Sequence, residues 1–243
     1  MKFKNFLKGA VIAGTLCAAG AGTAIAQAAN CEATEFGSEA GELYLKAETE
    51  LLQNKNPQAA LQAMNQLRNK ELNCYEQGAV LRLGAAIKIQ ADDYAGAARD
   101  LETAINQGYI SGKDAVNTYY QIFQIYLSQN DLNKALEYSQ KWVNAGGSPD
   151  RDAMWQLAVV NQKLERNQEA LKWAERVFER DGSNADRQVY DFLIYLYDET
   201  GQRAKKAALL EQLLAKNPSE RKLWDAISGD YFAADQDRKA FEV

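Results

Sequence analysis

The chain has 243 residues, of which 47% are hydrophobic and 25% are charged, with three prolines and a net charge of −5. This composition supports a substantial folded unit built mostly of helices, and it excludes a disordered or collagen-like chain. Histidine is absent, which removes the most common general base, metal ligand and pH switch together.

Residues 1–29 have the pattern of a cleaved signal peptide. Three lysines lie within the first eight residues, and an apolar segment at 9–21 follows them. This segment is shorter than the roughly 20 residues that a membrane-spanning helix needs. Residues 24–28 offer two overlapping Ala-x-Ala sites, so we predict cleavage near residues 26–28 and export of the mature chain.

Cleavage makes the chain more acidic. Without the three lysines it has 25 basic and 33 acidic residues, a net charge of −8. Such a surface repels nucleic acid and anionic lipid, so neither is an expected partner, and no later segment is apolar enough to insert into a membrane. The charge suits a basic partner, although solubility alone also explains it.

Two cysteines remain after cleavage, Cys31 and Cys74. In an oxidising compartment an even pair is most simply a disulfide, and the alternative is two buried thiols. The bond would tie the tail at 30–40 to the end of the first repeat and would stabilise the fold by about 4 kcal/mol in the chain-entropy model. Neither cysteine lies in a CxxC motif, so redox catalysis has no support.

An internal repeat dominates the rest of the chain. Six short segments each have a polar turn, then a small residue, then an apolar stripe at helical spacing. The small residue lets two helices approach closely, and its six copies are Ala60, Ala97, Ala135, Ala170, Ala207 and Ala240. If Gly201 fixes the register of the fifth copy, Lys206 occupies this position instead.

The spacing of these copies predicts an all-α fold, an α-solenoid of helix–turn–helix repeats over residues 41–243. We expect five complete repeats and a truncated sixth, with starts near residues 41, 78, 116, 151, 187 and 221. Since a repeat array ends in a polar capping helix, we expect the apolar residues of the sixth repeat to lack cover. The chain would then be a fragment of a longer array, or a partner would cover Trp224, Ile227, Tyr231 and Phe232.

The repeats resemble the tetratricopeptide family, whose pattern is an aromatic, Leu-Gly, Tyr, a turn Gly, Ala, an aromatic, Ala and Pro. The best match is Asn217-Pro218 followed by Trp224, Tyr231 and Ala240. The resemblance implies stacked helix pairs whose first helices line a concave face.

That face is the candidate binding site. On the repeat register, aromatic side chains alternate there with Gln and Asp, which suits an extended peptide or a partner helix. The candidate residues are Tyr120, Gln121, Gln124, Trp155, Gln156, Val159, Asp191, Phe192 and Tyr195. The alternative for Trp155 and Phe192 is a place in the core between repeats. Family members that bind acidic C-terminal tails have Lys, Asn and Arg at these positions, so the resemblance does not imply that ligand.

No constellation of residues in the sequence indicates catalysis. Its carboxylate pairs lie in turns or on exposed faces, and it has no Gly-rich phosphate loop or Ca²⁺-binding loop. We therefore expect a protein that is not an enzyme and that needs no cofactor or metal.

The segment from Tyr195-Leu-Tyr-Asp-Glu-Thr-Gly-Gln202 through Asn217-Pro-Ser-Glu-Arg221 to Val243 is similar to a narrower group. These are periplasmic tetratricopeptide proteins that accompany TonB–ExbB–ExbD systems, and they continue past the point where this chain ends. The resemblance implies a periplasmic adaptor for energised outer-membrane uptake of iron complexes, with TonB, ExbB or ExbD as partner. Two alternatives are a cell-envelope scaffold for peptidoglycan enzymes or outer-membrane assembly, and an enzyme such as a lytic transglycosylase, which needs a catalytic Glu in a separate domain.

Overall fold

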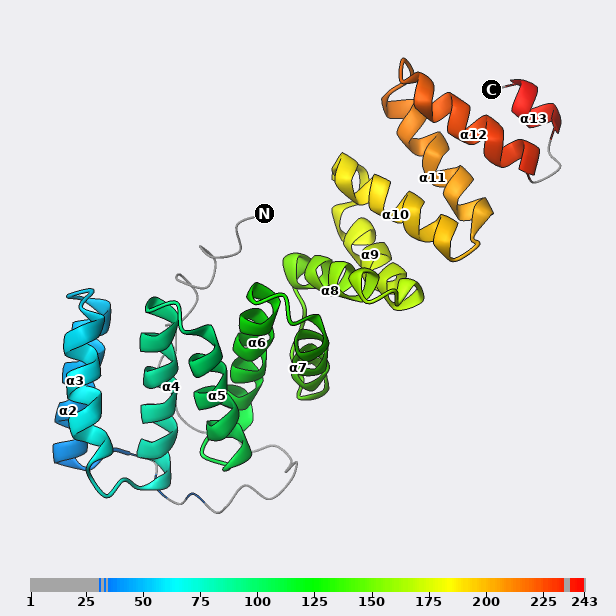
Figure 1. Cartoon of the computed structure of the whole chain (residues 1–243). Coiled ribbons are helices and arrows are strands. Elements are labelled where there is room, and N and C mark those ends of the chain that lie inside the picture. Colours follow the sequence, from blue (N-terminus) through cyan, green and yellow to red (C-terminus); the bar gives the residue numbers. More distant parts are fainter. Residues whose placement is uncertain (1–30, 32, 34, 234–236, 243) are drawn as a thin grey trace. The chain divides into compact units, whose positions relative to one another are not determined.

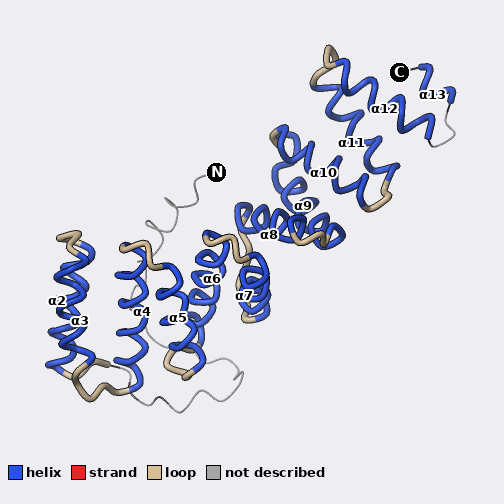
Figure 2. The backbone as a smooth tube through the Cα atoms, in the orientation of Figure 1, coloured by secondary structure: helices blue, strands red, loops and turns tan. Residues whose placement is uncertain are grey.

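The computed structural model describes residues 31, 33, 35–233 and 237–242. The predicted signal peptide and its cleavage site lie outside the described residues. Within the described part, all regular structure is helical (Figure 2). This confirms the all-α solenoid that the repeat spacing predicts.

The helices follow one another as six helix–turn–helix pairs (Figure 1). The first helices of the pairs are α2 (Ser38–Leu52), α4 (Cys74–Gln90), α6 (Gly112–Ser128), α8 (Arg151–Lys163), α10 (Arg187–Glu199) and α12 (Arg221–Ala233). The second helices are α3 (Pro57–Arg68), α5 (Tyr94–Asn106), α7 (Leu132–Asn144), α9 (Asn167–Asp181), α11 (Arg203–Lys216) and α13 (Asp237–Glu242).

The first helices start at or shortly before the positions that the repeat register predicts. The first three, α2, α4 and α6, start three or four residues before positions 41, 78 and 116, whereas α8, α10 and α12 start at 151, 187 and 221. The early start of α4 has a clear cause, because the Asn73 side chain accepts a hydrogen bond from the Glu76 N–H while the Glu76 side chain accepts one from the Asn73 N–H. This capping box satisfies two backbone donors that a helix otherwise leaves open.

The chain divides into two compact units, the first ending at Gly147 and the second beginning at Ser148. In the first unit, α2, α3 and α4 enclose a core that includes Leu51, Met64 and Leu67, each at most 1% exposed. In the second unit, one continuous core runs from Met154 in α8 to Ala240 in α13. Helix pairs that each expose an apolar face stack in this way because a single pair cannot bury that face alone.

The turn inside each of the first five pairs sets the register of the small residue. One residue of each turn has a positive φ, and these residues are Lys55, Asp92, Asn130, Glu165 and Gly201. The fifth residue after each of the first four is an alanine with no exposed surface: Ala60, Ala97, Ala135 and Ala170. The small residue at this position is thus confirmed in four pairs.

The fifth pair departs from this rule. Counting five residues from Gly201 reaches Lys206, so the assignment of Ala207 to the small-residue position is wrong. The Lys206 ammonium group lies 2.7 Å from Asp198 Oδ1 in α10 and 3.0 Å from Asp230 Oδ1 in α12. A charged residue can occupy this close-packed position because each neighbouring helix supplies a carboxylate.

A second repeated contact links three of the pairs to the pair before them. In α6, α10 and α12, a tyrosine donates its hydroxyl proton to a glutamate in the preceding second helix: Tyr126 to Glu102, Tyr197 to Glu175 and Tyr231 to Glu211. The equivalent position in α8 is Asn161, which is 2% exposed and donates to the Leu157 carbonyl of its own helix. The tyrosine–glutamate contact is therefore specific to certain junctions.

The last helix pair is better covered than the sequence suggests. Ile227 and Tyr231 in α12 are 1% and 6% exposed, because they share one core with leucines of α11 and with Ala240 of α13. Trp224 is half-buried and donates its indole N–H to the Pro218 carbonyl. The expectation of an uncovered sixth repeat is wrong for Ile227 and Tyr231, whereas Trp224 is only partly buried and Phe232 is 47% exposed.

The tail before α2 is fixed to the start of α4. The predicted disulfide between Cys31 and Cys74 is present, with the two Cα atoms 5.6 Å apart. The Gly37 N–H donates to Glu76 Oε1 at 2.8 Å, and Phe36 packs on Tyr44 with ring centroids 4.7 Å apart. The disulfide therefore reinforces a segment that hydrogen bonds and aromatic packing also hold.

Candidate functional site

In the second unit, helices α8 and α10 each bury one face in the core, and the residues of the opposite face are partly buried or exposed. In α8, Met154, Leu157 and Ala158 are buried, while Trp155 and Val159 on the other face are half-buried. In α10 the core positions are Val189, Tyr190, Leu193, Leu196 and Tyr197. The 3.6-residue period therefore separates a core stripe from an open stripe on both helices. We call this open stripe the α8–α10 face and define it by Trp155, Gln156, Val159, Asp191, Phe192 and Tyr195.

The aromatic side chains of this face contact one another across the two helices. The Trp155 and Phe192 rings meet edge to face, with centroids 5.0 Å apart, and both pack on the core below them. The Gln162 amide donates to the Tyr195 hydroxyl at 3.4 Å, and Tyr195 is 41% exposed. The two interpretations of Trp155 and Phe192 thus both remain open, because each ring packs against the core and is only partly buried.

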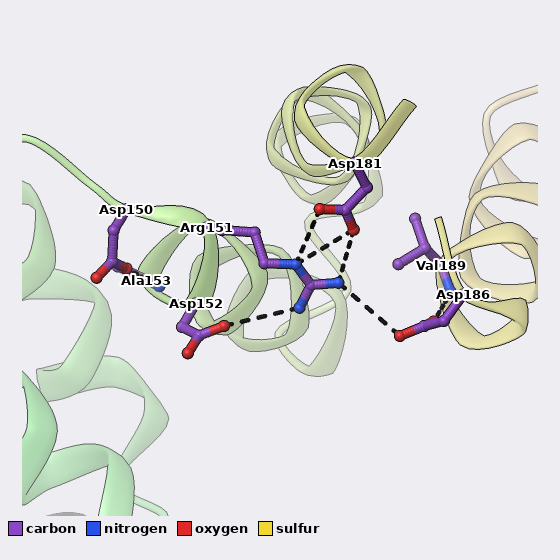
Figure 3. Close-up of polar contacts among 7 residues, drawn as sticks. All are labelled: Asp150, Arg151, Asp152, Ala153, Asp181, Asp186 and Val189. Atoms are coloured by element: carbon purple, nitrogen blue, oxygen red, sulfur yellow. Dashed lines mark hydrogen bonds and ion pairs between the residues drawn. The ribbon is translucent and has the colours of Figure 1, made fainter. Parts of the chain in front are cut away.

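A charged cluster at the start of α8 holds three helix ends together (Figure 3). Arg151 donates to both oxygens of Asp181 at the end of α9, with its Nη2 2.7 Å from Oδ2. The same nitrogen lies 3.9 Å from Asp186, which caps α10 by accepting from the Val189 N–H. The hydrogen bond to Asp181 raises the pKa of Arg151.

A similar clamp lies at the start of the next pair. Arg187 donates to both oxygens of Glu220, at 2.6 and 2.9 Å, and to Asp191 on its own helix at 2.6 Å. The hydrogen bonds to Glu220 and Asp191 raise the pKa of Arg187. Arg151 and Arg187 both occupy the first position of their helices, but their acceptors differ in place, because Asp181 ends α9 whereas Glu220 directly precedes α12.

Sequence reasoning missed these clamps. An arginine begins each of the helices α8, α10 and α12, namely Arg151, Arg187 and Arg221. This recurrence is visible in the sequence and could have indicated a repeated contact. The acceptors of Arg151 and Arg187, namely Asp181 and Glu220, lie 30 and 33 residues further along the chain. Only the folded chain brings these residues into contact: Arg151 and Asp181 lie at the start of α8 and the end of α9 in one pair, and Glu220 directly precedes α12.

The remaining candidate residues belong to the first unit. Tyr120 packs on Trp142 with ring centroids 4.5 Å apart. Gln121 is half-buried, and Gln124 is only 6% exposed. Burial makes Gln124 a poor contact for any ligand, whereas Tyr120 and Gln121 are partly buried and stay candidates apart from the α8–α10 face.

The described residues contain no group of three or more His, Cys, Asp or Glu side chains arranged to hold a metal ion. In the same part of the chain, every helix is too short or too polar to span a bilayer. What the α8–α10 face offers is aromatic surface, amide groups and carboxylates, and these groups suit binding.

Comparison with solved structures shows the fold. A tetratricopeptide repeat protein from Parabacteroides merdae matches 85% of this chain and 77% of its own length, with 13% identity and a TM-score of 0.54. YrrB, described as a tetratricopeptide protein with an unusual peptide-binding site, matches 76% of this chain and 89% of its own, with 16% identity and a TM-score of 0.50. No protein-family model and no curated protein matches the chain. The architecture is therefore that of a tetratricopeptide-type solenoid.

Proposed function

We propose that this chain is a periplasmic protein–protein interaction scaffold, and that it acts as an adaptor beside a TonB–ExbB–ExbD system. The observation that carries the binding role is the α8–α10 face, where Trp155 and Phe192 are only partly buried and Tyr195 is 41% exposed. Aromatic rings on a rigid helical support are typical of binding hot spots because they bury a large area at small entropic cost. The proposed role is binding rather than catalysis.

Two further features support the finer parts of the proposal. The pattern of residues 1–29 favours export, and the Cys31–Cys74 disulfide suits an oxidising compartment such as the periplasm. The similarity of residues 195–243 to TonB-associated tetratricopeptide proteins is the basis for naming the client. YrrB, which shares the fold, is described as having a peptide-binding site, which supports a peptide or protein as the ligand.

Capture from a periplasmic extract tests this proposal. The bait is the mature chain, compared with a Trp155→Ala variant and with a Trp173→Ala control. Trp173 is also half-buried in the second unit, but it lies in α9, where its ring contacts Arg176. Circular dichroism of each bait checks that the helices persist.

The expected result is that TonB, ExbB or ExbD is retained by the wild type and by the control, and is lost with Trp155→Ala. Retention of peptidoglycan enzymes or outer-membrane assembly factors instead would favour the alternative scaffold. If the same proteins bind all three baits, the α8–α10 face is not the binding site.

A further inference from the structure

We propose that the α8–α10 face selects a basic partner, namely a segment with Lys or Arg beside a large apolar side chain. This inference rests on the proposed binding function and adds the chemistry of the ligand. It follows from an imbalance between carboxylates and cations around the aromatic side chains of the face.

The first part of the imbalance is at Arg151. Its guanidinium is shared among three carboxylates, and only Asp181 forms close hydrogen bonds, at 2.7–3.2 Å. Asp152 and Asp186 lie 3.7 and 3.9 Å away, beyond hydrogen-bond distance, and their side chains are 70% and 61% exposed. Figure 3 shows all three acids around the one cation. Since a carboxylate can accept about four hydrogen bonds, Asp152 and Asp186 keep acceptor capacity.

The second part is at Arg187. This guanidinium is divided between Glu220 and Asp191, and Asp191 is 55% exposed. Asp191 directly precedes Phe192 and lies one helical turn before Tyr195 on the same open stripe. A carboxylate therefore sits beside the aromatic surface with oxygen acceptors still exposed.

The far ends of the two helices do not reverse this balance. Lys163 at the end of α8 is exposed, and the turn that follows adds the exposed residues Glu165 and Arg166, whose charges cancel. At the end of α10, Glu199 is exposed and accepts a hydrogen bond from the neutral Asn167 amide at 3.2 Å. Carboxylates thus outnumber cations along the face.

These groups define the partner. An apolar side chain can lie against Trp155, Phe192 and Tyr195, and a neighbouring Lys or Arg then reaches Asp152 or Asp191. An acidic segment would instead meet guanidinium groups whose donors are already shared between carboxylates. Charge complementarity of this kind sets partner choice and association rate more than total affinity.

Two labelled peptides provide the test. One has a central Leu-Phe-Leu flanked on both sides by lysines, and its twin has glutamates in place of the lysines. Binding to the mature chain is followed by fluorescence anisotropy at two salt concentrations. The variant Asp152→Asn/Asp191→Asn removes two charges with little change in shape. A matched control, Glu169→Gln/Glu179→Gln, removes two charges from α9.

We expect the lysine peptide to bind at least about tenfold more tightly than its twin, since like charges across an interface are strongly unfavourable. The Asn variant should weaken that binding about fivefold and reduce its salt dependence, as expected for two exposed ion pairs. The control should change it less than about twofold, because its charges lie outside the face.

Equal binding of the two peptides, stronger binding of the glutamate twin, or binding of neither overturns the choice of a basic partner. An equal loss of affinity in the Asn variant and in the control overturns it too, because general attraction to an acidic protein then explains the binding.

A separate Trp155→Ala variant keeps the two proposals distinguishable. If Trp155→Ala removes binding but the Asn variant does not, the face binds and only its preference for basic partners fails. If Trp155→Ala leaves the binding of both peptides unchanged, the α8–α10 face is not the site, and the proposed function loses its support.

Discussion

Replacing Lys206 by alanine tests which force governs the fifth helix pair. Four other pairs have alanine at this position, so close packing alone predicts that Lys206→Ala is harmless or stabilising. Electrostatics predicts the opposite. Asp230 Oδ1 accepts from Lys206 at 3.0 Å, while its Oδ2 is buried and has no hydrogen-bond partner. Removing the ammonium group leaves the whole carboxylate without a partner.

The magnitude follows from burial. The side chains of Lys206 and Asp230 are each 15% exposed, whereas Asp198 is 62% exposed and can be solvated. Breaking a buried ion pair from one side costs roughly 3–5 kcal/mol, and the remaining exposure lowers our expectation to about 2–4 kcal/mol. The double variant Lys206→Ala/Asp230→Ala removes both charges, so its cost should be only about 1 kcal/mol.

Hydrogen exchange of the α11 and α12 amides is the appropriate assay, because a repeat array need not unfold in one step. Lys205→Ala is a control from the adjacent residue. Lys205 is 56% exposed and pairs with Glu175 at 2.8 Å, so its loss should cost at most about 1 kcal/mol. The electrostatic explanation is refuted if these amides are as well protected from exchange in Lys206→Ala as in the wild type. It is also refuted if they are no better protected in the double variant than in Lys206→Ala.

Three other predictions concern separate parts of the chain. The disulfide joins residues that are 43 positions apart in the sequence, so Cys31→Ser should lower the free energy of unfolding by up to about 4 kcal/mol. A reductant should then lower the melting temperature of the wild type but not that of the variant. Arg151→Lys keeps the charge but loses the bidentate contact with Asp181, so hydrogen exchange at the start of α8 should speed up even though the net charge is unchanged. Burial raises the pKa of Tyr44 to about 12, so the folded state holds this proton more tightly than the unfolded state. The free energy of unfolding should therefore fall as the pH rises from about 10 to 12, and Tyr44→Phe should reduce that fall. An unchanged alkaline unfolding profile in Tyr44→Phe would contradict the last prediction.

Local rules in the sequence were enough to predict the repeat. A residue with positive φ followed five positions later by a small buried residue is a short-range pattern, and helical periodicity separates the core stripe from the open stripe within each helix. The same logic placed Trp155, Phe192 and Tyr195 on one face. The pairing of Cys31 with Cys74 needed only the count of cysteines left in an exported chain.

Contacts between residues about 30 positions apart could not be predicted in this way. The contact of Arg151 with Asp181 and the burial of Ile227 depend on how helices pack against one another. The contacts of Arg187 with Glu220 and of Lys206 with Asp230 depend on where the next pair begins. Burial of Gln124 likewise depends on neighbours outside its own helix. The sequence by itself therefore determined the helices, their register and their open faces, because these depend on neighbours within about five positions along the chain. The packing of the helices against one another decided which charges on those faces are shared and which carboxylates keep acceptor capacity, because side-chain pairing across helices is a property of the packed structure.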